Sequence, residues 1–162
     1  MTNKVFDTAF KLLLKNEGGY VNDPRDAGGE TKYGISKRAY PKLNIRDLTI
    51  EEAKEIYKRD YWDRCKCDFL PDALSVAVFD YAVNSGVIKA VKGLQKCLGI
   101  KQDGKVGNQT LCAVNGWPRK KLVDEYMQQR INFLMSLKGW QIYGNGWGKR
   151  VERVKNCCMQ LI

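Results

Sequence analysis

The most constraining feature of this 162-residue sequence is a nearly continuous apolar segment at its centre, DALSVAVFDYAVNSG, at positions 72–86. In a helix, its apolar side chains would cover almost the whole circumference, which is typical of a helix buried on all sides. Asp80 and Asn84 are its main polar exceptions, and they lie one turn apart on the same face. The sequence therefore predicts a central buried helix, beginning at Pro71-Asp72, that other elements must surround.

The rest of the chain predicts the helices that would surround it. A chain of this length fits one domain, and we find no linker, low-complexity tract or long repeat. We therefore expect a mainly α protein with a small β-hairpin or loop after its first helix. Apolar spacing and capping residues predict helices over 5–16, 49–61, 88–98, 110–114, 118–137 and 147–161, one helical turn over 35–40, and a glycine-rich loop over 139–146.

Chemistry is concentrated in residues 17–35, EGGYVNDPRDAGGETKYGI, directly after the first predicted helix. The segment carries four carboxylates and a threonine among five glycines, which favours an irregular hairpin or Ω-like loop. A helix that ends at Gly-Gly before a polar, turn-rich segment can hold a carboxylate at the lip of a cleft. The carboxylates are Glu17, Asp23, Asp26 and Glu30, and the threonine is Thr31.

The absence of histidine limits the possible chemistry. It excludes Ser-His-Asp and Cys-His catalysis, and any zinc site would need four thiolates. The pairs Cys65/Cys67 and Cys157/Cys158 lack the spacing of common structural zinc sites, so we expect buried reduced thiols, no metal and no cofactor. Any hydrolysis by this chain must therefore use carboxylates.

The chain has 28 basic and 18 acidic residues, a formal net charge of +10. From Trp117 onward it has nine basic residues against three acidic ones, which indicates an anionic partner. Nucleic acid is disfavoured because no binding motif with interleaved aromatic residues is present. The sequence also lacks the roughly 18 consecutive apolar residues of a membrane span and the pattern of a signal peptide. An anionic lipid surface and an anionic wall polymer remain as candidate partners.

Glycoside hydrolysis needs one carboxyl that donates a proton and a second carboxylate that activates water or attacks the sugar. The helix dipole disfavours ionisation of Glu17 only weakly, so an acid role also requires partial burial, for which Tyr20, Tyr33 and Trp62 are candidate walls. Asp26 lies nine residues further on, and Thr31 is a candidate for holding water. This arrangement favours inversion, whereas a shorter carboxyl separation would indicate retention.

Structural explanations also exist for each of these residues. A glutamate before Gly-Gly is often a solvated helix end, and DPRD is often a self-capping turn. Asp80 and Asn84 suit a buried hydrogen-bonded pair better than substrate contact. Tryptophans such as Trp62 are more often core or groove wall than sugar platforms.

The segment EGGYVNDPRDAGGETKYGIS resembles the signature of glycoside hydrolase family 108, in which Glu-Gly-Gly-Tyr is followed by Asp-x-Gly-Gly-x-Thr-x-x-Gly-Ile. The resemblance continues in FDYAVNSG at 79–86, in AVKGLQKCLGIKQDGKVGNQT, which is similar to a predicted peptidoglycan domain, and in GWGKRV at 146–151. It implies a lysozyme-like helical fold, with a catalytic half at 1–86 and a C-terminal half at 87–162 in one compact unit.

The resemblance implies an N-acetylmuramidase that cleaves the β-1,4 bond between N-acetylmuramic acid and N-acetylglucosamine, with Glu17 as the acid. The expected second carboxylate is Asp26, with Glu30 as the alternative, and Thr31 is the residue expected to hold water. The candidate substrate contacts are Tyr20, Tyr33, Trp62, Asp80 and Asn84. We expect a monomer made in the cytoplasm that reaches the periplasmic wall through a holin or similar route, as a phage or prophage endolysin. The alternatives are a bacterial muramidase that serves secretion and a non-catalytic peptidoglycan-binding protein.

Overall fold

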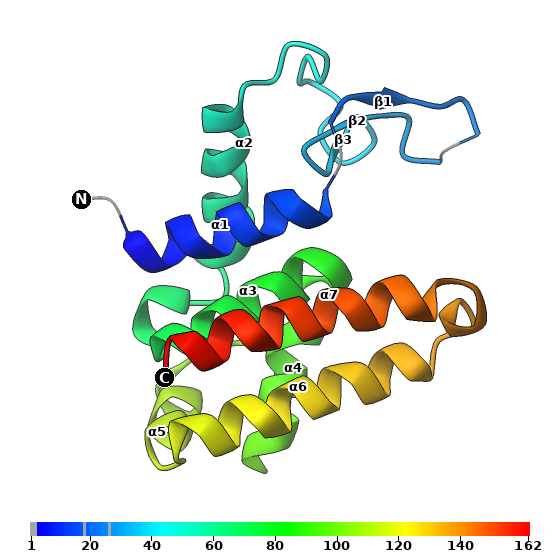
Figure 1. Cartoon of the computed structure of the whole chain (residues 1–162). Coiled ribbons are helices and arrows are strands. Elements are labelled where there is room, and N and C mark those ends of the chain that lie inside the picture. Colours follow the sequence, from blue (N-terminus) through cyan, green and yellow to red (C-terminus); the bar gives the residue numbers. More distant parts are fainter. Residues whose placement is uncertain (1–2, 18, 26) are drawn as a thin grey trace.

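The computed structural model describes residues 3–17, 19–25 and 27–162, and it is mainly helical as expected. In Figure 1, α1, α2 and a small sheet lie on one side of a layer that contains α3, α4, α6 and α7. The helices are α1 (Lys4–Asn16), α2 (Ile50–Tyr57), α3 (Asp72–Ser85), α4 (Val87–Leu98), α5 (Asn108–Asn115), α6 (Arg119–Met135) and α7 (Trp140–Gln160), with a π-helical turn η1 (Lys58–Trp62) and a 3-10 turn η2 (Cys67–Phe69).

Helix α3 is the centre of the fold, as the apolar segment predicted. It packs against α1, α4, α6 and α7, and the ten residues from Ala73 to Ala82 are all buried. Because a helix apolar on every side is stable only when other elements cover it, this one segment determines the positions of the others. The two polar residues of this helix differ in burial: Asp80 is 2% exposed, whereas Asn84 lies at the exposed end of the helix.

The predicted hairpin is a three-stranded antiparallel sheet of β1 (Val21–Asn22), β2 (Glu30–Lys32) and β3 (Ile35–Ser36), in that order. The helical turn predicted over 35–40 is wrong at its start, because Ile35 pairs with Lys32 in the sheet. Tyr33 and Gly34 form the tight connection, with φ angles of 54° and 80°. Ile35 is buried and faces the core from the strand β3.

The loop predicted over 139–146 is also wrong, because α7 begins at Trp140. Glycine weakens an isolated helix, but packing overrides that preference here. A Cβ atom on Gly144 would lie 2.8 Å from Cδ2 of Trp140, so only glycine lets this indole ring lie against the helix backbone. Trp140 also packs against Trp147, which lies about two helical turns further along α7. The extra turns of α7 are thus stabilised by aromatic packing.

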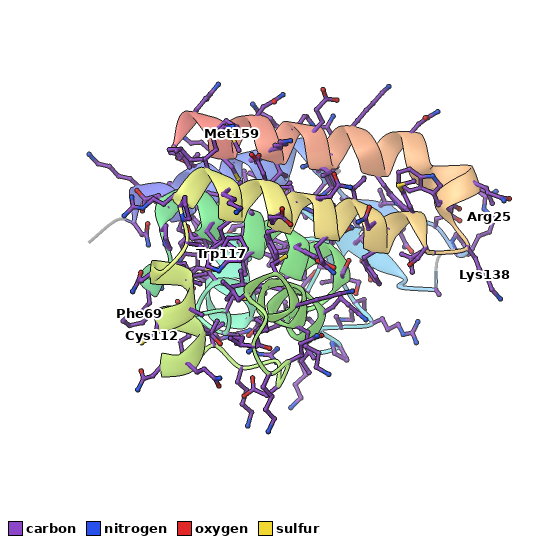
Figure 2. All side chains as sticks on the ribbon, turned by 90° about the horizontal axis from the view of Figure 1, so that it is seen from below. Arg25, Phe69, Cys112, Trp117, Lys138 and Met159 are labelled. Atoms are coloured by element: carbon purple, nitrogen blue, oxygen red, sulfur yellow. The ribbon has the colours of Figure 1, made fainter. Side chains whose placement is uncertain are left out.

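Helices α6 and α7 run side by side along one face of the molecule (Figures 1 and 2). Figure 2 shows Arg25 and Lys138 extending away from the ribbon, as expected for a basic surface. Cys65, Cys67 and Cys158 are buried free thiols, but the expectation of burial is wrong for Cys112, which is exposed. Within the described ranges, no helix has both the length and the hydropathy that a bilayer crossing requires.

Candidate active site

Glu17 lies where α1 ends and the chain turns toward the sheet. Asn3 begins the helix by accepting hydrogen bonds from the backbone N–H groups of Val5 and Phe6, and the Glu17 N–H closes the last turn on the Leu13 carbonyl. The Glu17 backbone is extended, so its side chain leaves the helix axis. One quarter of that side chain remains exposed. The carboxyl is therefore partly withdrawn from water but still reachable.

Gly34 forms one side of the Glu17 site. A Cβ atom at this position would lie 2.9 Å from Cδ of Glu17 and 2.5 Å from the Tyr57 hydroxyl oxygen. The Tyr57 hydroxyl donates a 2.7 Å hydrogen bond to the Tyr33 carbonyl, which fixes the β2–β3 connection beside Glu17. Burial, and then the charge of Glu17, raise the pKa of Tyr57 well above its usual value. Tyr57 therefore remains a neutral hydrogen-bond donor.

Arg150 of α7 holds the other side of the site. Its Nη1 lies 3.4 Å from Oε1 of Glu17, while its Nε and Nη2 donate to the two carboxylate oxygens of Asp80 at 3.1 and 3.2 Å. Arg130 of α6 also donates to Asp80, at 2.8 Å, and to Oδ1 of Asn84 at 3.3 Å. One buried carboxylate thus positions two arginines, and one of them reaches Glu17.

The charges in this cluster stabilise one another. Burial acts to raise the pKa of the Asp80 carboxyl, but Arg130 and Arg150 outweigh it and hold that pKa below the ordinary value. Burial likewise acts to lower the pKa of Arg150, but Asp80 and then Glu17 outweigh it, so the pKa is raised. Asp80 is consequently an ionised anchor for the arginines. This is a different role from the substrate contact considered from the sequence.

The other candidate site residues lie on or beside the small sheet. Thr31 and Glu30 are neighbours on β2, so their side chains point to opposite faces of the strand. Glu30 accepts a 2.7 Å hydrogen bond from the hydroxyl of Tyr20, which is 40% exposed. Asp26, the favoured second carboxylate, lies outside the described residues. Its role, and those of Thr31, Tyr20 and Tyr33, remain predictions.

Two of the candidate substrate contacts are corrected by the structure. Trp62 is 1% exposed in the core, where its ring packs against Phe6 and Phe79 and its Nε1 donates to Asp68. Asp80 is 2% exposed and fully engaged by arginines. Neither side chain can contact a substrate. Asn84 is exposed beside the cluster, so its side chain is accessible to a substrate.

Sequence reasoning did not single out Tyr57, Arg130 or Arg150 as site residues. Arg150 is part of the GWGKRV motif, so the resemblance marked its position but not its role. Tyr57 and Arg130 read as ordinary helix residues, because nothing in their local sequence shows which distant segments they contact. In the described part of the chain, no group of three or more cysteine, aspartate and glutamate side chains is arranged to hold a metal ion.

A buried central helix, with a carboxylate at the end of the first helix beside a small sheet, is the arrangement of the lysozyme-like glycoside hydrolases. Comparisons with known proteins define the family. The sequence model described as glycosyl hydrolase 108 matches residues 10–86, and the one described as a predicted peptidoglycan domain matches residues 89–152. The chain belongs to glycoside hydrolase family 108, and it is a glycoside hydrolase that acts on peptidoglycan.

A solved structure supports this assignment along the whole chain. The structure of Brucella abortus SagA superposes with a TM-score of 0.89 and 34% sequence identity, covering 99% of this chain and 97% of that one. The likeness therefore includes both the half that carries Glu17 and the half that carries Arg150. A search of curated proteins finds no significant match.

Proposed function

We propose that this protein is an N-acetylmuramidase that hydrolyses the β-1,4 bond between N-acetylmuramic acid and N-acetylglucosamine, with Glu17 as the general acid. The observation that carries the proposal is the position of the Glu17 carboxyl. The Glu17 side chain is three-quarters buried, and its carboxyl is held on one side by Arg150 and closely packed on the other by Gly34. A general acid needs such a fixed orientation and an open path to the leaving oxygen.

Arg150 orients the Glu17 carboxyl by a single, longer contact. Both Asp80 oxygens already accept hydrogen bonds from this guanidinium, and the contact to Glu17 is the longest of the three that it makes. Glu17 in its protonated form donates to the glycosidic oxygen as the bond to the sugar carbon breaks. A second carboxylate takes the proton of the attacking water, or itself attacks that carbon. Glu17 contributes the bond-breaking proton in both cases.

Asp26 is the proposed second carboxylate, with Thr31 as the residue that holds the water. The alternative is Glu30, but its hydrogen bond from Tyr20 already occupies one of its oxygens. That bond ties the residue directly before β1 to β2, so Glu30 has a structural role independent of catalysis. Tyr20, Tyr33 and Asn84 are the proposed substrate contacts.

The biological setting we propose is a phage or prophage endolysin, a monomer that is made in the cytoplasm and reaches the periplasmic wall through a holin or similar route. A bacterial muramidase that opens the wall for secretion is the alternative, and a holin or a secretion locus beside the gene separates the two. The formal charge of +10 supports attraction to the anionic wall, although that attraction is weakened by salt.

The test is mass spectrometry of purified peptidoglycan digested with the native protein and with Glu17→Gln. We expect new reducing-end muramic acid with the native protein, and a loss of about 10²–10⁴-fold in the variant, as for removal of a general acid. Glu55→Gln changes an exposed glutamate of α2 and serves as the matched control. Reducing-end glucosamine, anhydro-muramic ends, or full activity of Glu17→Gln would each overturn the proposal. Binding without cleavage would indicate a non-catalytic peptidoglycan-binding protein.

A further inference from the structure

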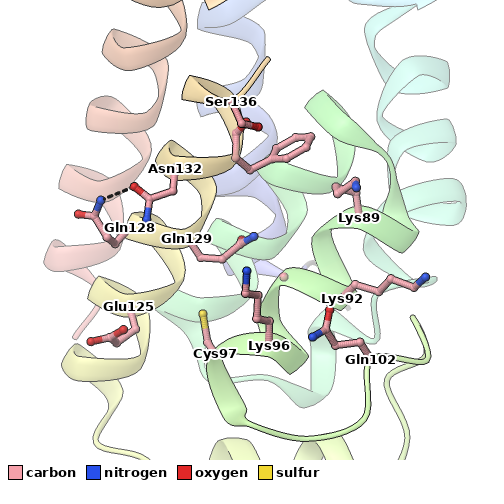
Figure 3. Close-up of a pocket in the computed structure, with 12 residues that line it drawn as sticks. Lys89, Lys92, Lys96, Cys97, Gln102, Glu125, Gln128, Gln129, Asn132 and Ser136 are labelled. Atoms are coloured by element: carbon pink, nitrogen blue, oxygen red, sulfur yellow. Dashed lines mark hydrogen bonds between the residues drawn. The ribbon is translucent and has the colours of Figure 1, made fainter. Parts of the chain in front are cut away.

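A hollow lies between α4 and α6, lined by none of the residues of the Glu17–Arg150 cluster. Its volume of about 650 Å³ lies within the range of roughly 300–1,000 Å³ that is typical of small-ligand sites. Figure 3 shows side chains from both helices directed into the space between them. All of its lining residues fall within the match to the predicted peptidoglycan domain.

One wall of this cavity is basic. Lys89, Lys92 and Lys96 follow one another at helical spacing on α4, while the opposite face of α4 is buried in the core. Glu125 is the one acidic residue among the described residues that line the cavity. Three lysines against one glutamate leave a local charge of +2, so an anionic ligand is favoured.

The other wall presents amide groups from α6. Gln128 donates a 2.9 Å hydrogen bond to Asn132, which aligns these two amides. Gln129 lies against Gly93 of α4, where a Cβ atom would be 2.5 Å from Oε1 of Gln129, so a side chain at position 93 would displace this amide. Lys96 and Gln129 point toward one another across the gap (Figure 3). Side-chain amides can both donate and accept, which matches the groups of a peptide backbone.

We propose that this cavity binds the acidic stem peptides of peptidoglycan, whose carboxylates pair with the lysines and whose amides bond to Gln128, Gln129 and Asn132. The proposal rests on peptidoglycan being the substrate. A bare sugar is a poorer fit, because Phe133, the aromatic residue that the cavity offers, already has Nζ of Lys89 4.9 Å from its ring centroid. A phosphate polymer would match the lysines but leave the row of amides without complementary groups.

The test measures calorimetric binding of a synthetic stem tetrapeptide, containing γ-glutamate and diaminopimelate, to the full chain at low salt. Lys89→Glu/Lys96→Glu reverses two charges of the cavity wall, seven residues apart on α4. Lys4→Glu/Lys11→Glu is the matched control, because it reverses two exposed lysines with the same spacing on α1 and makes the same change in net charge. Thermal unfolding of both variants confirms that they fold.

We expect the cavity variant to bind the tetrapeptide about tenfold more weakly than native protein, a difference of about 1.4 kcal/mol, and the control to remain within about twofold. Amidation of the peptide carboxylates should weaken binding to native protein to a similar extent. Equal binding by the two variants, or binding of glycerol phosphate in place of the tetrapeptide, would overturn the inference. Failure of the muramidase proposal is separate, because it appears as missing reducing-end muramic acid with native protein, whatever the peptide binding shows.

Discussion

The guanidinium of Arg150 lies 3.4 Å from the carboxylate of Glu17, although 133 positions separate the two residues in the chain. Asp80 at the centre of α3 makes this contact possible, because both of its carboxylate oxygens accept hydrogen bonds from Arg150 and fix the guanidinium in place. The end of the first helix, the central helix and the last helix therefore meet at one point. Five consequences of this geometry and of its neighbourhood can be measured.

Arg150→Lys should lower kcat by about tenfold or more and change KM little. A lysine ammonium cannot hold both oxygens of Asp80 and also reach Glu17, so the acid would lose its fixed orientation. Steady-state hydrolysis of soluble glycan strands measures the two parameters. Arg119→Lys, at an exposed position of α6, is the control. An unchanged kcat would show that Arg150 has only a structural role.

Gly34→Ala should impair both stability and activity. The position has a φ of +80°, and the new Cβ would meet Tyr57 and Glu17 at 2.5 and 2.9 Å. The left-handed backbone alone costs roughly 1–2 kcal/mol for a residue with a side chain. Gly29→Ala shares the positive φ but has its nearest neighbour at 4.0 Å, so it isolates the strain. We expect both variants to be destabilised in urea, Gly34→Ala by more because it adds the clash, and we expect a much larger loss of activity for Gly34→Ala. Equal activities would contradict the close contact.

Asp80→Asn should destabilise the protein by about 3 kcal/mol at neutral pH, because it removes the counter-charge of buried Arg130 and leaves Arg150 with Glu17 alone. The folded-state pKa of Asp80 is depressed, so its contribution is present above the unfolded-state pKa and is lost as pH falls through the folded-state value. The stability difference between native protein and variant should therefore narrow in acid. Urea unfolding at pH 7 and pH 3 measures it, and a constant difference would exclude the ionised anchor.

Gly144→Ala should destabilise the protein by roughly 1–3 kcal/mol, as expected for overpacking. The added methyl would collide with the Trp140 ring, whose Cδ2 atom lies 2.8 Å from the new Cβ. Gly146→Ala lies in the same helix with nothing within 4 Å, and should be neutral or stabilising because alanine favours helices. Thermal unfolding compares the two. The same sign for both variants would contradict the packing of Trp140.

Asp26→Asn should reduce wall lysis far more than Glu30→Gln. Glu30 already accepts the hydrogen bond from Tyr20, and the glutamine amide oxygen can still accept it. Turbidity loss of purified walls compares the two variants. The reverse order would transfer the second-carboxylate role to Glu30.

Nuclear magnetic resonance of the first anomer released by native protein then separates inversion from retention.

The sequence predicted the elements whose pattern is local. The circumferential apolar pattern identified α3, the capping sequence at Thr49 identified the start of α2, and Gly-Gly placed Glu17 at a helix end. The start of α7 was missed because its glycines suggest a loop. The rings of Trp147 and Trp140 pack against Gly139 and Gly144, and this packing is not visible in the local sequence. Ile35 was assigned to a helical turn because a single buried residue does not distinguish a turn from a short strand.

The candidate site was predictable only in part, for the same reason. Glu17 was found because its helix end and its motif are both local in sequence. The arginines that surround it were not, because their positions depend on how α6 and α7 pack against α3. Trp62 was misassigned as a possible wall of the site, since an aromatic residue in an amphipathic helix gives no indication of which buried partners it meets. Its contacts with Phe6 and Phe79 place it in the core.

The location of Arg150 on α7 has a consequence for synthesis of the protein. A ribosome produces Glu17 133 positions before Arg150, so over that interval the growing chain carries the acid without the group that orients it. Premature termination before position 150 would leave the Glu17 segment intact but its side chain unsupported. For an enzyme that breaks down the wall of a cell, this order means that the acid is oriented only after α7 has been made.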